Sequence, residues 1–149
     1  MTDGNPSSDT ATGESDTVQQ ETLLAIDDDT AFLDRIRRFL IRHGWVVLTA
    51  SDPAEGLRLY GEQWQRISLV LLDYYMPVLE GDQVWRFLHE INQHVRVLWI
   101  TASDDYIPPK MRNGDHNGFV QKPATRKDLL RGIQKVLNHQ DQFGGVPAD

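Results

Sequence analysis

The chain has 149 residues, of which 40% are hydrophobic and 25% are charged, and it contains no cysteine. This composition is ordinary for one globular domain, and the absence of cysteine excludes disulfides, thiolate metal sites and a cysteine nucleophile. The formal net charge of −7 argues against electrostatic binding to nucleic acid. Because no apolar run is long enough for a membrane span, we expect a cytoplasmic protein.

The two ends of the chain differ in composition from its middle. Residues 1–20 are rich in Ser, Thr, Gly and Asp and almost lack large apolar side chains, so we predict a disordered N-terminal tail. Residues 139–149, with Gly-Gly and Pro, are predicted to be a flexible C-terminal tail. Residues 22–138 are expected to form one compact domain.

Within that domain, short apolar segments alternate with amphipathic ones. Their length and β-branched content predict strands over residues 22–26, 45–49, 68–72, 95–100 and 118–121. Apolar residues at helical spacing predict helices over residues 30–44, 51–60, 81–91 and 124–137. Phe32 is placed on the apolar face of the first of these helices, and Phe87 on that of the third. Several of the strands are apolar almost throughout, which suits a parallel sheet covered on both faces. The alternation therefore predicts a doubly wound α/β domain with five parallel strands.

Helix start and stop signals support these boundaries. Asp52 and Pro53 form a cap and first helical position, and Thr125 with Asp128 forms a capping pair. Gly44 lies where the first helix should end. Asp29 is interpreted as the cap of that helix rather than as a metal ligand.

Polar residues follow four of the predicted strands. Residues 27–29 are three aspartates after the first strand, Asp73 ends the third, Thr101 ends the fourth and Lys122 follows the fifth. Parallel strands of an open α/β sheet bring their carboxyl ends to one edge, where ligands bind. Carboxylates gathered there need a cation, and an oxygen-only ligand set favours Mg²⁺. With a hydroxyl and an ammonium nearby, the edge is predicted to be a site at which an aspartate accepts phosphate.

Four segments, "AIDDDTAFL", "LVLLDYYMP", "ITAS" and "QKP", closely resemble in order and spacing the receiver domain of bacterial two-component response regulators, the CheY-like family. The resemblance covers about residues 22–138. It implies a flavodoxin-like fold with strand order 2-1-3-4-5. It also implies a phosphorylation-dependent signalling switch, not an enzyme acting on other substrates.

The resemblance assigns the chemistry to particular residues. Asp73 would be the phosphoacceptor, supplied by a sensor histidine kinase or a phosphotransfer protein. Asp27 and Asp28, with Asp73 and the backbone carbonyl of Tyr75, would hold Mg²⁺. Tyr75, two residues after Asp73, departs from the family pattern, and its bulky ring is expected to shield the acyl phosphate from water and slow self-dephosphorylation.

The remaining family positions lie on the last two strands. Thr101 and Lys122 would bind the phosphoryl group, and Thr101 with Phe119 would form the switch that signals to a downstream protein target. The peptide bond before Pro123 would be cis, and Ser103 would tune the site.

The segment "SDDYIPPKMRNGDHNG" departs from the family. Pro108 and Pro109 exclude helix before that point and Gly114 is a stop signal, so we predict an irregular or shortened fourth helix. The face that receivers usually use for dimers would be altered there, and a homodimer would use a non-standard face.

Two other functions stay open. A Mg²⁺-dependent phosphatase of the haloacid-dehalogenase type would need Asp-x-Asp-x-Thr/Val after the first strand, but "DDDTA" ends in Ala31. A receiver-like scaffold that never accepts phosphate would have no need of the acidic set. The eleven residues after residue 138 are too few for an output domain, so we expect either a stand-alone receiver or a fragment of a longer regulator or hybrid kinase. The start at Met1 and the long N-terminal tail favour the stand-alone receiver.

Overall fold

The computed structural model describes residues 20–102 and 116–145, with the backbone alone for residues 139–145. Within these ranges the chain alternates strands and helices. They are β1 (Thr22–Ile26), α2 (Thr30–Arg42), β2 (Val46–Ala50), α3 (Pro53–Gln63), β3 (Ile67–Asp73), α4 (Gly81–Ile91), β4 (Val97–Thr101), β5 (Asn117–Gln121) and α6 (Arg126–Gly145). Ser103 and the segment predicted to carry a short fourth helix lie outside the described residues.

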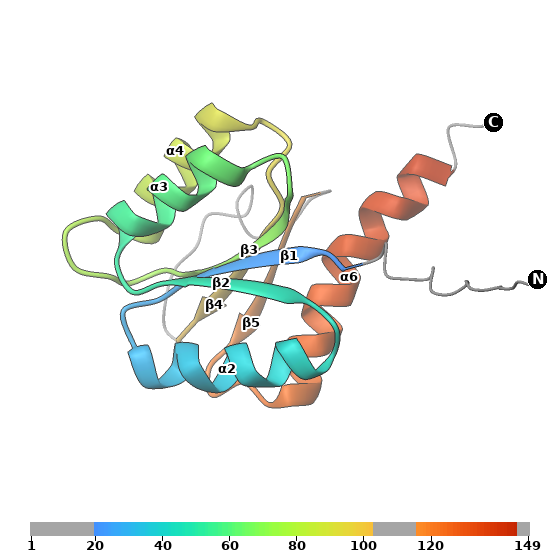
Figure 1. Ribbon diagram of the computed structural model, residues 1–149, viewed down its shortest axis with the longest axis horizontal. Coiled ribbons are helices and arrows are strands. Elements are labelled where there is room, and N and C mark those ends of the chain that lie inside the picture. Colours follow the sequence, from blue (N-terminus) through green and yellow to red (C-terminus); the bar gives the residue numbers. More distant parts are fainter. Residues whose placement is uncertain (1–19, 103–115, 146–149) are drawn as a thin grey trace, which may run out of the picture.

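The five strands form one parallel sheet in the order β2-β1-β3-β4-β5. Helices α2 and α6 cover one face of the sheet, and α3 and α4 cover the other (Figure 1). The predicted doubly wound fold and its strand order are therefore confirmed. The first strand and the helix over residues 81–91 coincide with their predicted ranges.

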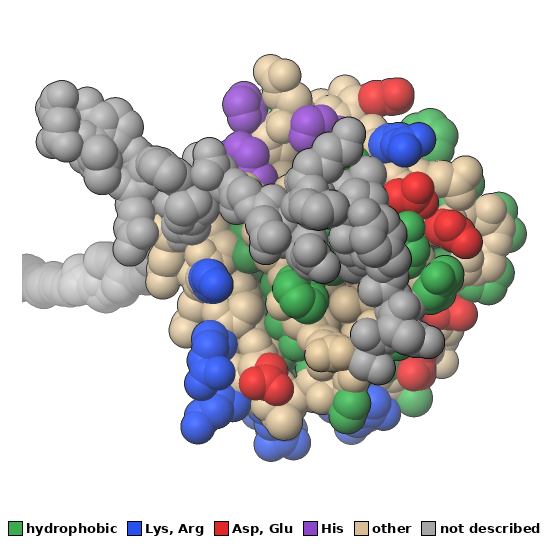
Figure 2. All heavy atoms as spheres, turned by 180° about the vertical axis from the view of Figure 1, so that it is seen from behind, with side chains coloured by type: hydrophobic (Ala, Val, Ile, Leu, Met, Phe, Trp, Pro, Cys, Tyr) green, Lys and Arg blue, Asp and Glu red, His purple; other side chains and the backbone are tan. Residues whose placement is uncertain are grey.

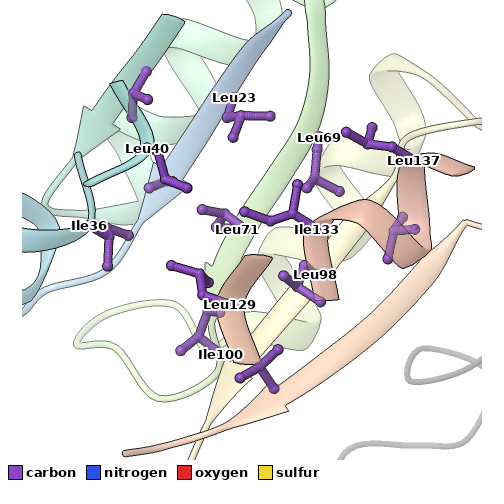
Figure 3. Packing of buried hydrophobic residues seen from close by; sticks show 14 of the residues in the cluster. Leu23, Ile36, Leu40, Leu69, Leu71, Leu98, Ile100, Leu129, Ile133 and Leu137 are labelled. Atoms are coloured by element: carbon purple, nitrogen blue, oxygen red, sulfur yellow. The ribbon is translucent and has the colours of Figure 1, made fainter. Parts of the chain in front are cut away.

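The core consists of two apolar layers, one on each face of the sheet. Side chains of successive strand residues point to opposite faces, so β3 divides its residues between the layers. Leu69 and Leu71 pack beneath α2 and α6 (Figure 3). Val70 and Leu72 pack beneath α3 and α4. This double burial fixes β3, the central strand, and with it the position of Asp73 at its end.

Local capping holds the helices in the predicted places. Asp29 accepts a hydrogen bond from the Phe32 amide at 3.1 Å, and Asp52 accepts one from the Glu55 amide at 2.9 Å. The Asp128 amide donates to the Thr125 hydroxyl at 3.0 Å. After α2, Gly44 adopts φ +97°, a left-handed conformation that glycine reaches without steric cost.

Two details differ from the sequence-based expectations. Phe87, placed by its spacing on the buried face of α4, is exposed, because Val84 and Leu88 already fill the contact with the sheet. Helix α6 continues to Gly145, beyond residue 137, where the predicted helix ends. Among the described helices, none combines the length and the apolar character required to cross a bilayer.

Candidate functional site

The polar residues predicted to meet do lie along one edge of the sheet. Asp27 follows β1, Asp73 ends β3, and Thr101 ends β4. Asp73 is in register with Ile100, the residue before Thr101, so the acid and the hydroxyl residue end neighbouring strands. The Lys122 amide donates to the Thr101 carbonyl at 2.7 Å, which fixes the end of β5 beside them.

Three carboxylates form a compact cluster at this edge. Asp27, Asp28 and Asp73 each offer an oxygen, and these oxygens all lie within 4.8 Å of one another. Asp27 is 2% exposed and Asp73 is 7% exposed, whereas Asp28 is exposed. Like charges at such distances in a partly buried pocket repel one another strongly.

Lys122 supplies the positive charge that the cluster faces. Its Nζ lies 3.1 Å from Asp27 Oδ2 and 3.5 Å from Asp73 Oδ1. The other oxygen of Asp27 accepts a hydrogen bond from the Asp29 amide at 2.9 Å. The same ammonium lies 4.8 Å from the centroid of the Phe32 ring, a cation–π contact that orients it.

The positive charge of Lys122 is not enough to keep the pKa values of Asp27 and Asp73 at their ordinary level. Burial, and then the charge of Asp27, raise the pKa of Asp73 to about 7. Burial also raises the pKa of Asp27, against the opposing effect of its hydrogen bonds. Partial burial disfavours the charge on Lys122, but the two carboxylates outweigh it and raise the pKa of the ammonium.

The donor set fits a hard divalent cation. All three side chains present carboxylate oxygens, with no histidine or cysteine among them, and Mg²⁺ prefers such ligands. A cation between Asp27 and Asp73 would favour the ionised form of both acids, against the burial and the neighbouring negative charge that raise their pKa values.

Two other predicted site residues, Tyr75 and Phe119, have exposed side chains. The Tyr75 side chain is 56% exposed and its ring contacts that of Tyr74 edge-on, with centroids 5.2 Å apart. Phe119, on β5, is 46% exposed and so is not a core residue. The Lys122–Pro123 peptide bond is cis.

Sequence reasoning missed two contacts that shape the site. The spacing of Phe32 predicts its place on a helix face, but nothing in that spacing indicates the contact with Lys122. Gly81 lies at the start of α4, and its amide donates to the Tyr74 carbonyl at 2.6 Å. A Cβ on Gly81 would lie 2.6 Å from Trp99 Cζ3. The glycine therefore lets α4 approach the end of β3 closely, and "EGD" was the only signal for it.

Comparisons with known proteins agree with this geometry. The family model described as "Response regulator receiver domain" matches residues 23–134. Response regulator MprA of Mycobacterium leprae is 31% identical over 117 residues, which are 77% of this chain and 50% of that protein. The transcriptional regulatory protein AfsQ1 of Streptomyces coelicolor is 30% identical over 134 residues, 85% of this chain and 59% of that protein. The chain thus spans about half the length of these curated relatives.

Solved structures show the same similarity. A response regulator receiver domain protein from Clostridium thermocellum has a TM-score of 0.74 and 31% identity, covering 83% of this chain and 98% of that one. A CheY-like receiver domain protein from Methanospirillum hungatei has a TM-score of 0.73 and 26% identity, covering 84% of this chain and 99% of that one. With its sheet order, its acidic strand ends and these matches, the chain belongs to the family of response regulator receiver domains of two-component signalling.

Proposed function

We propose that Asp73 accepts a phosphoryl group from a sensor histidine kinase or a phosphotransfer protein, and that the acyl phosphate switches the domain's binding to a downstream protein target. The observation that carries this proposal is the placement of Lys122 Nζ within 3.1 Å of Asp27 and 3.5 Å of Asp73, beside a cluster of three carboxylates. A carboxylate nucleophile, a cation-binding acidic set and an ammonium are the parts that phosphoryl transfer requires.

The residues of this site would divide the work between them. A carboxylate oxygen of Asp73 attacks the donor phosphorus, and a P–O bond forms as the P–N bond of the phosphohistidine breaks. The electron pair leaves with the imidazole. Asp27, Asp28 and Asp73, with the Tyr75 carbonyl, would hold Mg²⁺, which neutralises charge on the transferred group. The ammonium of Lys122 and the hydroxyl of Thr101 would bind the phosphoryl oxygens.

Tyr75 would set the lifetime of the signal, and Phe119 with Thr101 would set its output. Tyr75 is exposed beside the acceptor, and we propose that its ring shields the acyl phosphate from water. Phe119 is exposed on the edge strand β5, where a change in ring position would alter the surface offered to a target. Thr101, at the end of the adjacent β4, would couple the phosphoryl group to that ring.

A dehalogenase-type phosphatase has less support. It would need Asp29 as the second acid of an Asp-x-Asp pair. The carboxylate of Asp29 accepts the Phe32 amide and caps α2, and it is exposed. The acid that lies with Asp27 is Asp73, from a different strand.

Incubation with Mg²⁺ and acetyl phosphate, followed by intact-mass measurement, tests the proposal. We expect a mass increase of one phosphoryl group that Asp73→Asn abolishes. Asp29→Asn is the matched control, because it changes a neighbouring carboxylate outside the cluster and should leave phosphorylation intact. A folded protein that stays unmodified would support the scaffold, and turnover of added phosphomonoesters would support the phosphatase.

A further inference from the structure

A basic groove runs between α2 and the start of α6. It has a volume of about 420 Å³, and none of the described residues that line it is acidic. Four arginines and two aromatic rings contribute to its walls: Arg35, Arg38, Arg42, Arg126, Phe32 and Phe39. Figure 2 shows Lys and Arg side chains gathered toward the edge of the molecule on which α2 and α6 lie. In a chain of net charge −7, this concentration of positive charge needs an explanation.

Three of the four groove arginines have no acidic partner among the described residues. Among the described residues, no carboxylate lies within ion-pair distance of Arg35, Arg42 or Arg126. Arg38 pairs with Asp34 at 2.8 Å, but both side chains are more than half exposed, and such pairs contribute little. The Arg126 guanidinium lies 5.6 Å from the centroid of the Phe39 ring. The groove therefore offers positioned cations next to apolar rings, which suits an acidic peptide.

The chain itself contains such a peptide. Residues 1–19 have four carboxylate side chains and neither lysine nor arginine. The four are Asp3, Asp9, Glu14 and Asp16. We propose that this acidic segment binds in the basic groove of its own chain.

The acidic segment enters the domain close to one end of the basic groove, the end at Arg42. The Val46 amide donates to the Glu21 carbonyl at 2.9 Å, and Val46 follows shortly after Arg42, the last residue of α2 (Figure 1). The segment thus joins the domain at the Arg42 end. Nineteen extended residues reach roughly 60 Å, whereas the 13 residues of α2 span roughly 20 Å. Tethering gives effective concentrations of order mM, so a weak electrostatic affinity suffices.

The groove also adjoins the candidate phosphoacceptor site, and this part of the inference rests on the proposed function. Phe32 lines the groove and lies 4.8 Å from Lys122 Nζ, which pairs with Asp73. An acidic segment bound here would place negative charge beside the site, and this charge would repel an incoming phosphoryl group. The segment would act as a salt-sensitive restraint on phosphorylation.

A spin label tests the binding directly, because the chain has no cysteine and Ser8→Cys gives a single attachment point. With a nitroxide at that position of the full chain, amide signals of Arg38 and Phe39 should lose intensity by about twofold or more at low salt. Raising NaCl to about 0.5 M, where the Debye length is roughly 4 Å, should restore them. Neutralising the segment should also restore these signals at low salt; the variant combines Asp3→Asn, Asp9→Asn, Glu14→Gln and Asp16→Asn.

Substitutions in the groove, and a mixture of labelled and unlabelled chains, complete the test. The double variant Arg35→Gln, Arg126→Gln should weaken the signal loss. Arg37→Gln is the control, because Arg37 lies on the same helix as Arg35 but does not line the groove, and it should leave the signal loss unchanged. Signal loss that persists in the neutralised segment, or that centres on α3 and α4, would overturn the proposal. Equal loss when labelled chain is mixed with isotope-enriched unlabelled chain would assign the groove to a second copy instead. None of these readouts needs Mg²⁺ or phosphate, so a failure to phosphorylate Asp73 would leave them unaffected.

Discussion

Asp73 ends the central strand with a second buried carboxylate beside it and a single ammonium facing both. In the absence of a cation, this arrangement raises its pKa to about 7, mainly through burial. The folded state therefore binds the Asp73 proton more tightly than the unfolded chain, whose Asp pKa is about 3.9. The proposed phosphoacceptor thus destabilises the fold when it is ionised.

A pH dependence of stability follows from this residue. In the presence of a chelator, the free energy of unfolding should fall as pH rises from about 5 to 7, by at most about 1.4 kcal/mol per pH unit for one group. Asp27, whose pKa is also raised, acts in the same direction. The raised pKa of Lys122 changes the free energy of unfolding only in the alkaline range, where its contribution to stability is lost as the pH rises. Urea unfolding at several pH values measures the effect.

Asp73→Asn should flatten that profile and make the protein more stable than wild type at pH 8. Asp34→Asn, which changes an exposed acid in a surface ion pair, should leave the slope unchanged. A free energy of unfolding that increased from pH 5 to pH 8 in the chelated wild type would contradict the raised pKa of Asp73.

At the scale of elements, the loop between β3 and α4 shows what sequence patterns could and could not supply. The strand and the helix were predicted because their apolar spacing and caps are local signals. The loop path depends on tertiary contacts instead. Val78 adopts φ +76°, which is rare for a β-branched residue, and the Leu79 amide donates to the Pro77 carbonyl at 2.9 Å. The exposure of Phe87 likewise depends on tertiary packing, because Val84 and Leu88 are the α4 side chains that are buried against the sheet.

Gly81 anchors that loop, and its replacement is expected to be costly. A Cβ there would meet Trp99 at 2.6 Å and the Tyr74 Cα at 2.8 Å, and backbone cannot move aside cheaply. Gly81→Ala should therefore lower the free energy of unfolding by about 1–3 kcal/mol. Gly61→Ala in α3 is the matched control, because the nearest atom would be 4.0 Å away. That change should stabilise the helix by about 0.5–1 kcal/mol in the same urea titrations. Equal effects of the two changes would show that the close approach at Gly81 is not what matters.

At the scale of the molecule, the sequence predicts those features of the site that follow from the topology of the sheet. Parallel strands with buried flanks must bring their carboxyl ends to one edge, so Asp27, Asp73 and Lys122 could be placed together from the sequence. The contact of Phe32 with Lys122 and the groove between α2 and α6 could not. Both depend on how two helices, distant in the sequence, pack side by side on one face of the sheet.

The acidic edge also links cation binding to the stability of the whole domain. A cation that binds the folded cluster but not the unfolded chain stabilises by RT ln(1 + [L]/Kd), about 2.7 kcal/mol at a hundredfold excess over Kd. Mg²⁺ at pH 8 should then raise the melting temperature by about 5 °C or more. Asp27→Asn removes one buried ligand and should reduce this increment, whereas Asp34→Asn should retain it. The comparison is between melting curves with Mg²⁺ and with chelator for each variant, so differences in baseline stability cancel. An increment as large in Asp27→Asn as in wild type would place the cation elsewhere than in the cluster around Asp73.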